Sequence, residues 1–196
     1  MRIIAGAWRG RALQAPSGQA TRPTADRVRQ ALFDMLWHAP WGGHELLDGA
    51  TVLDAFAGSG ALGLEALSRG AAHATFMEHD RTALAALRRN VAACGADDRC
   101  AVRAIDVLSA PAGTACDLVF LDPPYGGDLV GQALARLRAG GWIAAGSTVI
   151  VETGRTEALA PQGTLLTERV HGAARLTIWR IEPAPGVMTS SARTPC

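Results

Sequence analysis

Four residues at positions 122–125, with the sequence DPPY, have the types and spacing best suited to chemistry in this chain. The carboxylate of Asp122 and the backbone carbonyl of Pro123 can accept hydrogen bonds from an exocyclic amine. Pro123 and Pro124 fix φ and remove two backbone donors, so that only acceptors face the amine. The ring of Tyr125, the only tyrosine, can stack on the base that carries the amine. All four residues are therefore predicted to form a catalytic site for the amino group of a nucleobase.

A glycine-rich segment, DAFAGSGALG at 54–63, has the composition of a ligand-binding turn between a strand and a helix. Gly58, Gly60 and Gly63 match the dinucleotide-binding fingerprint, in which glycines permit a tight turn and a close approach of the ligand to the backbone. This pattern alone also fits NAD and FAD proteins. Asp54 favours a different ligand, because a carboxylate inside the turn suits the cationic amino-acid end of S-adenosylmethionine better than a pyrophosphate.

Further carboxylates follow the next predicted strands. Glu78 lies 24 residues after Asp54. A carboxylate there can accept hydrogen bonds from both hydroxyls of a ribose. This supports a ligand that contains adenosine, without choosing between S-adenosylmethionine and a dinucleotide. Asp106 can accept from an adenine amine or cap a turn, and Asp80 is predicted to cap the following helix. The predicted cofactor-binding residues are Asp54, Ala55, Gly58, Ser59, Gly60, Glu78, Asp106 and Asp122.

Alternating strands and helices position these residues from Thr51 onward. The pattern predicts strands at 52–56, 74–77, 101–105, 118–121 and 148–151, helices at 62–68, 82–94 and 130–139, and a terminal hairpin at 165–170 and 176–181. Such alternation is typical of an α/β fold with a doubly wound, mostly parallel sheet, here of seven strands with an antiparallel C-terminal hairpin. The segments 54–63 and 122–125 follow strands that flank the topological switch point, so we expect them to face each other across one crevice.

The chain divides by pattern into four parts. Residues 1–37 are predicted to form an RNA-binding extension, with a small β-hairpin in 1–20 and a helix that begins at Thr24 or Asp26 and runs to about Trp37. Residues 38–50 are a linker and residues 51–182 form the domain that holds both motifs. Residues 183–196, rich in Pro, Ser, Thr and Ala, are predicted to be a disordered tail.

The composition is that of one globular domain, since 48% of the 196 residues are hydrophobic and 19% are charged. The apolar stretches have the length of strands, and the N-terminus has no long apolar segment, so we expect a cytoplasmic protein without a membrane span or signal peptide. No CxxC pair and no histidine cluster is present, so we predict free thiols and no metal site. The cysteines are Cys94, Cys100, Cys116 and Cys196.

The basic residues are distributed unevenly. All 19 are arginine, and six of them fall in the first 29 residues against one acid, Asp26, although the net charge of the chain is only +1. A basic segment on a nearly neutral protein indicates a polyanionic partner. Arg9, Arg11, Arg22 and Arg29 are the predicted contacts to RNA phosphates, although Arg29 could equally be a surface charge on a helix.

Taken together, the motifs make the chain resemble, over about residues 1–182, the bacterial small-subunit rRNA guanine-N2 methyltransferases, the family that modifies guanine 966 of 16S rRNA. The matching segments are RIIAG at 2–6, WRGR at 8–11, RPTADRVR at 22–29, DAFAGSGALGLEALSR at 54–69 and DPPY at 122–125. Asp34 stands where the family has Asn, and the linker 38–50 is longer than usual. These departures concern local loop geometry more than the reaction.

The resemblance implies a class I (Rossmann-like) methyltransferase fold, S-adenosylmethionine as methyl donor, S-adenosylhomocysteine as product, and a monomer that acts on 16S rRNA in the small subunit or in an assembly intermediate. A guanine would be flipped into the DPPY pocket, with Tyr125 stacked on it. The motif itself fits adenine as well as guanine, so an adenine-N6 methyltransferase is an alternative. An NAD(P)-dependent oxidoreductase and a non-catalytic assembly factor are further alternatives, of which the first rests on the glycine fingerprint alone.

Overall fold

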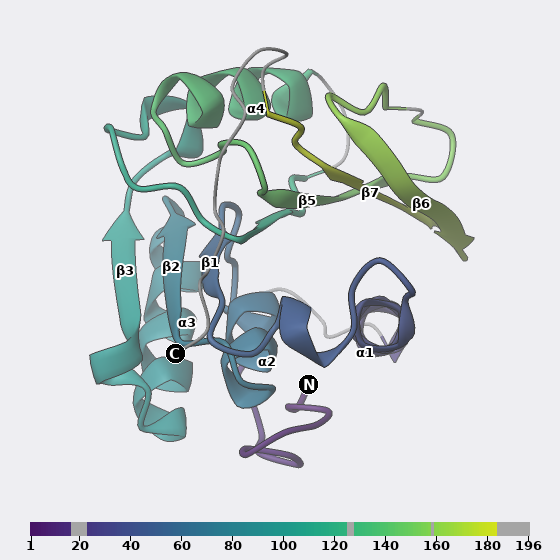
Figure 1. The fold of residues 1–196 in the computed structure, drawn as a ribbon. Coiled ribbons are helices and arrows are strands. Elements are labelled where there is room, and N and C mark those ends of the chain that lie inside the picture. The colour runs from purple at the N-terminus through teal and green to yellow at the C-terminus, as the bar shows by residue number, and fades with distance from the viewer. Residues whose placement is uncertain (17–22, 125–127, 158, 184–196) are drawn as a thin grey trace, which may run out of the picture.

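The structure, a computed structural model, describes residues 1–16, 23–124, 128–157 and 159–183. Within these ranges seven strands form one mixed sheet in the order β3-β2-β1-β4-β5-β7-β6 (Figure 1). Tyr125, Arg22 and nearly all of the predicted tail lie outside the described residues. The strands are β1 (Thr51–Asp54), β2 (His73–Glu78), β3 (Cys100–Ala104), β4 (Leu118–Leu121), β5 (Thr148–Gly154), β6 (Thr164–His171) and β7 (Ala174–Arg180).

The first five strands are parallel, as the alternation of strands and helices predicted. β1 pairs with β2 and β4, β2 pairs with β3, and β4 pairs with β5. Every residue of β4 is buried, as expected for a central parallel strand that is covered by helices on both faces. The order of strands reverses at β1 and β4, so the carboxyl ends of these two strands flank the switch point of the sheet.

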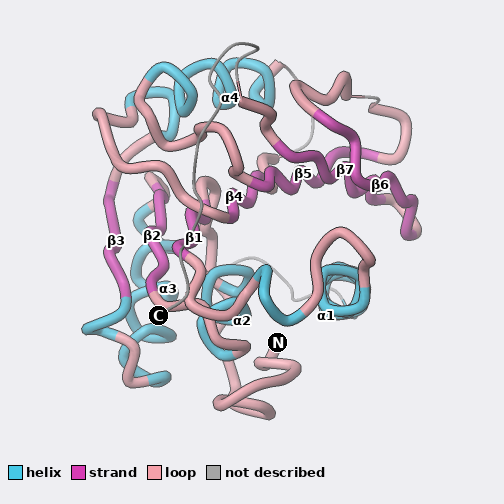
Figure 2. The backbone as a smooth tube through the Cα atoms, viewed as in Figure 1, coloured by secondary structure: helices cyan, strands magenta, loops and turns pink. Residues whose placement is uncertain are grey.

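Helices cover both faces of the sheet (Figure 2). The helices α1 (Pro23–His38), α2 (Ala61–Ser68) and α3 (Arg81–Cys94) pack on one face in a core that includes Phe33, Phe76 and Phe120. The helix α4 (Leu129–Ala139) packs on the other face, with Trp142 and Trp179. No helix of the described residues is long and apolar enough to cross a membrane.

The predicted ends of α3 are confirmed. Asp80 is the N-cap, and its carboxylate accepts hydrogen bonds from the backbone N–H of Thr82 at 2.9 Å and of Ala83 at 2.8 Å. Gly95 ends the helix with a φ of 61°, a left-handed conformation that glycine adopts without a steric penalty. The cap holds the chain between β2 and α3 in one conformation, directly beside Glu78.

The C-terminal hairpin is antiparallel, as predicted, and it lengthens β5. β7 pairs with β5 along its whole length, including Glu152 opposite Leu176 and Gly154 opposite Ala174. The sequence predicted that the strand ends at Val151, because Glu152-Thr-Gly lacks the apolar character of the preceding residues. Pairing with β7 extends the strand by three residues, and Glu152 therefore has a fixed position in the sheet.

The predicted N-terminal hairpin is present as a short turn with a single bridge, between Arg2 and Ala12. The Ile3 N–H donates to the Arg11 carbonyl at 2.9 Å, and the Gly10 N–H donates to the Ile3 carbonyl at 2.9 Å. This turn packs against α2 and leads to α1 through residues that the structure does not describe.

A buried carboxylate on α2 ties the N-terminal segment to that helix. Glu65 is fully buried, and its oxygens accept from the N–H of Ile4 at 2.7 Å, the N–H of Ala5 at 3.0 Å and the Nε of Arg69 at 2.8 Å. Three donors offset the cost of burying the charge. The segment 1–13 thus has a fixed place over α2.

Candidate active site

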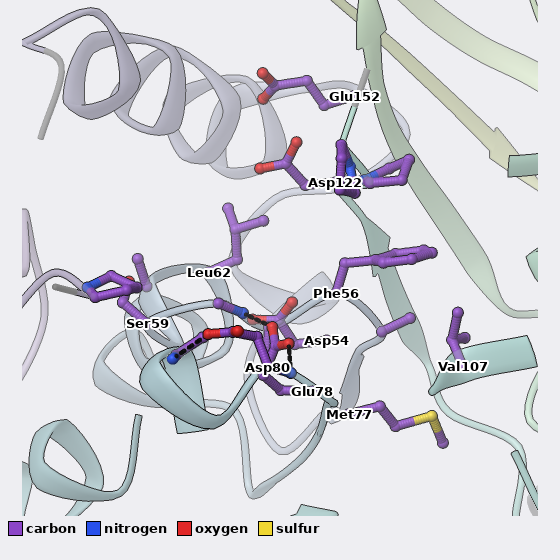
Figure 3. A pocket seen from close by; sticks show the side chains of 18 of the residues that line it. Asp54, Phe56, Ser59, Leu62, Met77, Glu78, Asp80, Val107, Asp122 and Glu152 are labelled. Carbon is purple, nitrogen blue, oxygen red and sulfur yellow. Dashed lines mark hydrogen bonds between the residues drawn. The ribbon is translucent and has the colours of Figure 1, made fainter. Parts of the chain in front are cut away.

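A cavity of about 810 Å³ opens at the carboxyl ends of β1, β2, β4 and β5 (Figure 3). Both sequence motifs contribute to its wall, as the position of the switch point predicted. Gly60 and Asp106 of the predicted set do not line it. The predicted residues that do are Asp54, Ala55, Gly58, Ser59, Glu78, Asp122, Pro123 and Pro124.

The glycine-rich turn places Asp54 at the amino end of α2. Gly58 and Gly60 have φ values of 54° and 79°, which disfavour other residues, and a Cβ on Gly60 would lie 2.4 Å from Leu87. The turn brings the Gly63 N–H to Oδ2 of Asp54 at 3.0 Å. Oδ1 of Asp54 is buried and has no hydrogen-bond partner among the described residues.

Burial raises the pKa of Asp54 to about 7, the hydrogen bond from Gly63 lowers it, and the charge of Glu78 raises it further. A positively charged group bound beside Oδ1 would stabilise the ionised carboxylate. The unpartnered oxygen therefore fits the ammonium end of S-adenosylmethionine.

Glu78 ends β2, and backbone amides hold both of its oxygens. Oε2 accepts from the Gly58 N–H at 2.8 Å, and Oε1 accepts from the N–H groups of His79 and Asp80, each at 2.8 Å. A carboxylate has about four acceptor positions, so Oε2 keeps capacity for a hydroxyl of a ligand. This geometry fits a ribose diol.

Apolar side chains continue the wall beyond Glu78. Met77, Ile105 and Val107 line the cavity there, and Figure 3 places Met77 and Val107 on the same side of Glu78. An apolar slot beside a ribose-binding carboxylate fits an adenine ring. The residues present thus fit S-adenosylmethionine at each of its three parts.

Asp106 caps a turn, which is the alternative to an adenine contact that the sequence left open. It is the N-cap of a 3₁₀ turn at Val107–Ser109, and its Oδ1 accepts from the Leu108 N–H at 2.9 Å. The side chain is exposed. Its contact with an adenine amine remains a prediction.

Asp122 follows β4 at the other end of the cavity. Its carboxylate is accessible from the cavity, although protein surrounds it on the remaining sides. This desolvation raises the pKa of Asp122 well above its usual range, and the charges of Glu152 and Asp54 raise it further. In Figure 3, Phe56 and Leu62 lie between Asp122 and the pair formed by Asp54 and Glu78.

Glu152 lines the cavity beside Asp122, and sequence reasoning missed it. Leu121 pairs with Val151 across β4 and β5, so the next residue on each strand, Asp122 and Glu152, reaches the same edge of the sheet. Glu152 belongs to no motif. The available signal was a carboxylate directly after the buried run TVIV of a parallel strand.

The predicted arginine contacts have different surroundings. Arg9 and Arg11 are exposed, and Arg11 donates to the Ala93 carbonyl. The alternative for Arg29, a surface charge on a helix, is wrong, because the residue is only 5% exposed. Its contact with an RNA phosphate stays a prediction. Its Nη2 donates to the Arg2 carbonyl at 2.6 Å and to Asp26 at 3.1 Å. Arg29 joins α1 to the N-terminal turn, and burial lowers the pKa of its guanidinium.

The N-terminal segment and α1 form one wall of the cavity. Met1, Pro16, Val28 and Leu32, all from the predicted extension at residues 1–37, line it. Among the described residues, no group of three or more His, Cys, Asp or Glu side chains could hold a metal ion.

The doubly wound sheet, with β7 antiparallel between β5 and β6 and the cavity at the switch point, defines a class I methyltransferase fold. The solved structure of the Escherichia coli protein yhhF has a TM-score of 0.80 and 38% identity, over 94% of this chain and 99% of that one. The Thermus protein TTHA0928 has a TM-score of 0.74 and 33% identity, over 92% and 99% of the two chains.

The chain belongs to the family described as Conserved hypothetical protein 95, which matches residues 1–180. A curated relative from Escherichia coli, named Ribosomal RNA small subunit methyltransferase D, is 44% identical over 155 residues, 78% of this chain and 74% of the relative. The protein of the same name from Haemophilus influenzae is 36% identical over 187 residues, 92% and 93% of the two chains.

Proposed function

We propose that this protein transfers a methyl group from S-adenosylmethionine to the exocyclic N2 amine of a guanine in 16S rRNA of the small ribosomal subunit. The observation that carries the proposal is that Asp122, Pro123 and Pro124 line the same cavity as Asp54 and Glu78. The names of the relatives support ribosomal RNA as the substrate.

Asp54 binds the ammonium of the cofactor, and Glu78 binds the ribose hydroxyls. Met77, Ile105 and Val107 enclose the adenine. When bound, S-adenosylmethionine would supply a methyl group on its sulfonium, and Asp54 and Glu78 would hold it in the same cavity as the base. Phe56 and Leu62, which line the cavity between Asp122 and the pair Asp54 and Glu78 (Figure 3), would exclude water from the path of the methyl group.

The target base leaves its stack to enter the cavity, at a cost of a few kcal/mol. Stacking on Tyr125 recovers about 1–3 kcal/mol. Asp122 and the Pro123 carbonyl accept the N–H groups of N2, which favours the pyramidal amine with a free lone pair. As the N2–methyl bond forms and the S–methyl bond breaks, Asp122 takes the proton that N2 loses, in keeping with the raised pKa of its carboxyl.

The test is methyl transfer from labelled S-adenosylmethionine to small subunits isolated from cells that lack this protein, followed by mass mapping of the 16S rRNA. We expect one new N2-methylguanine. A product methylated at adenine N6, or transfer to DNA and not to rRNA, would exclude the proposal in favour of an adenine methyltransferase.

The partner is then the small subunit or an assembly intermediate in the cytoplasm. The protein binds this partner as a monomer, through the exposed Arg9 and Arg11. Comparing naked 16S rRNA, assembly intermediates and complete subunits as substrates identifies the required state. Sedimentation of the protein alone tests the monomer.

A further inference from the structure

We infer that Glu152 selects guanine over adenine by accepting a hydrogen bond from N1–H of the target base, while Asp122 and the Pro123 carbonyl accept from its N2 amine. This role rests on the proposed function, since it specifies which edge of the base that same site recognises. It makes Glu152 a specificity-determining residue that touches the substrate.

The position of Glu152 is fixed from both sides. β5 lies between β4 and β7, with Val151 paired to Leu121 and Glu152 paired to Leu176. A side chain on a central strand has a better-defined position than one on a loop. The backbone therefore directs Glu152 to the cavity with little freedom.

The two carboxylates share one part of the cavity. Figure 3 shows the carboxylates of Asp122 and Glu152 pointing the same way from neighbouring strand ends, apart from Asp54, Glu78 and Asp80. The side chain of Glu152 is half-buried and lines the cavity. A base whose amine reaches Asp122 would bring its adjacent ring nitrogen towards Glu152.

The negative charges at the β4 and β5 end of the cavity favour a ligand that donates hydrogen bonds. The negative charge of Glu152 is one of the causes of the raised pKa of Asp122, since two neighbouring carboxylates disfavour ionisation of both. Of the charged residues that line the cavity, those at this end are both acids, and Arg29 lies on α1 with its Nη2 bound to Asp26 and to the Arg2 carbonyl. A ligand edge with several N–H groups would relieve the repulsion.

Guanine and adenine differ at the required atom. Guanine presents N1–H next to the N2 amine, so its edge offers consecutive donors to the two carboxylates. Adenine presents its N6 amine next to an unprotonated N1, whose lone pair would face the Glu152 carboxylate. A site that uses a buried acceptor discriminates strongly against a base that lacks the donor, and the repulsion adds to the discrimination.

The sharpest probe is 2-aminopurine, which keeps the N2 amine of guanine but has a lone pair at N1. Small subunits are reconstituted with 16S rRNA that carries guanine, 2-aminopurine or adenine at the methylated position. We expect kcat/KM of the unmodified protein to favour guanine over 2-aminopurine by about 10- to 100-fold, the range typical of one good base-edge contact. Adenine should be methylated more slowly still.

Glu152→Gln tests the residue itself. The amide can accept from N1–H of guanine and can also donate to N1 of 2-aminopurine, so the ratio of the two kcat/KM values should fall to within a few-fold of one. Binding of S-adenosylmethionine, measured by calorimetry, should be unchanged, because the cofactor residues lie at the other end of the cavity. Asp98→Asn is the matched control: it removes one exposed carboxylate from the 3₁₀ turn Asp97–Arg99, outside the cavity, and should leave both ratio and rate unchanged.

The outcomes separate the role of Glu152 from the proposed function. If the unmodified protein forms no N2-methylguanine, the proposed function fails. If it does but methylates guanine and 2-aminopurine at equal rates, Glu152 has no such role, and this comparison does not depend on the folding of any variant. A Glu152→Gln protein that binds the cofactor normally and keeps the full preference for guanine would overturn the role as well.

Discussion

The carboxylates at the two ends of the cavity differ in what surrounds them. At the β1 and β2 end, backbone N–H groups of Gly58, His79 and Asp80 hold both oxygens of Glu78. At the β4 and β5 end, Asp122 has another carboxylate, Glu152, as a neighbour, and no residue that the structure describes donates a hydrogen bond to it. Glu78 is therefore an acceptor held by three donors, whereas Asp122 has no donor among the described residues.

This difference in surroundings suits the β1 and β2 end of the cavity to binding and the β4 and β5 end to catalysis. Amides that point at a carboxylate fix its position before a ligand arrives, which suits recognition of hydroxyls and a cation. An acid with a raised pKa and no donor among the described residues can accept from an amine that enters the cavity, and it holds the amine's proton more readily afterwards. Asp54 lies between these extremes, with one oxygen bound to Gly63 and the other unpartnered.

The largest expected effect is that of Asp122→Ala. Loss of the acceptor and proton carrier should lower the rate of methyl transfer by at least about 10³-fold, within the range for a positioned acid–base group. The rate is measured in single turnovers with labelled cofactor. Calorimetry should show nearly normal binding of S-adenosylmethionine. A variant with normal turnover would mean that Asp122 is not catalytic and that the two ends of the cavity do not differ in this respect.

Asp54→Asn should affect the other end. The neutral amide is isosteric but lacks the charge, so the dissociation constant of S-adenosylmethionine should rise by a factor of about 10–150, which corresponds to about 1.5–3 kcal/mol for a hydrogen bond to a charged group. At saturating cofactor, kcat should change much less. A variant with normal affinity and a low kcat would assign Asp54 to catalysis and contradict the comparison.

The same residue gives a pH dependence of binding. The pKa of Asp54 is about 7, and its ionised form is the one that binds a cation. Affinity for S-adenosylmethionine should therefore rise as the pH is raised through about 7, with a proton released on binding. Calorimetry in buffers of different ionisation enthalpy measures the proton, and Asp54→Asn should show neither the release nor the pH dependence.

Much of this arrangement could be predicted from the sequence, because it follows local rules. Apolar runs that alternate with helices predicted the strands, and the doubly wound order brought segments 54–63 and 122–125 to one crevice. The cap at Asp80 was predicted from its position before a helix. The strands and the cap depend on residues close together in the chain, and the meeting of the two segments follows from a general rule for doubly wound sheets.

The rest depends on contacts between distant segments. Glu152 lies within β5 and not beyond its end because β7, some twenty residues further along, pairs with it. Arg29 was predicted to contact RNA because arginines crowd into the first 29 residues, with an exposed helix charge as the alternative, but the N-terminal turn covers it and accepts its hydrogen bond. Glu65, inside the cofactor motif, binds that turn instead of a ligand. The sequence alone carries no local signal for these pairings.

The methyl-transfer rate should fall at acidic pH, and this part of the pH–rate profile, its acidic limb, should show a smaller effect of mutation whose direction can be predicted. Protonated Asp122 accepts hydrogen bonds from an amine poorly, so transfer should slow as the pH is lowered through its raised pKa. Glu152→Gln removes a neighbouring negative charge, which lowers the pKa of Asp122, and the limb should move to lower pH. Single-turnover rates on guanine substrate measure it. An unmoved limb would mean that the two carboxylates do not act on each other.

The smallest effect concerns a residue outside both ends. Arg9 is exposed on the N-terminal turn, and Arg9→Ala should lower the slope of log K against log salt for binding to rRNA by about 1, as for the loss of one phosphate contact. Arg136→Ala, an exposed arginine on α4 across the sheet, is the matched control and should leave the slope unchanged. Because Arg9 lies in neither group of carboxylates, cofactor affinity and kcat at saturating rRNA should both remain normal. A fall in kcat would place the N-terminal turn within the chemistry of the site and not only in the delivery of RNA to it.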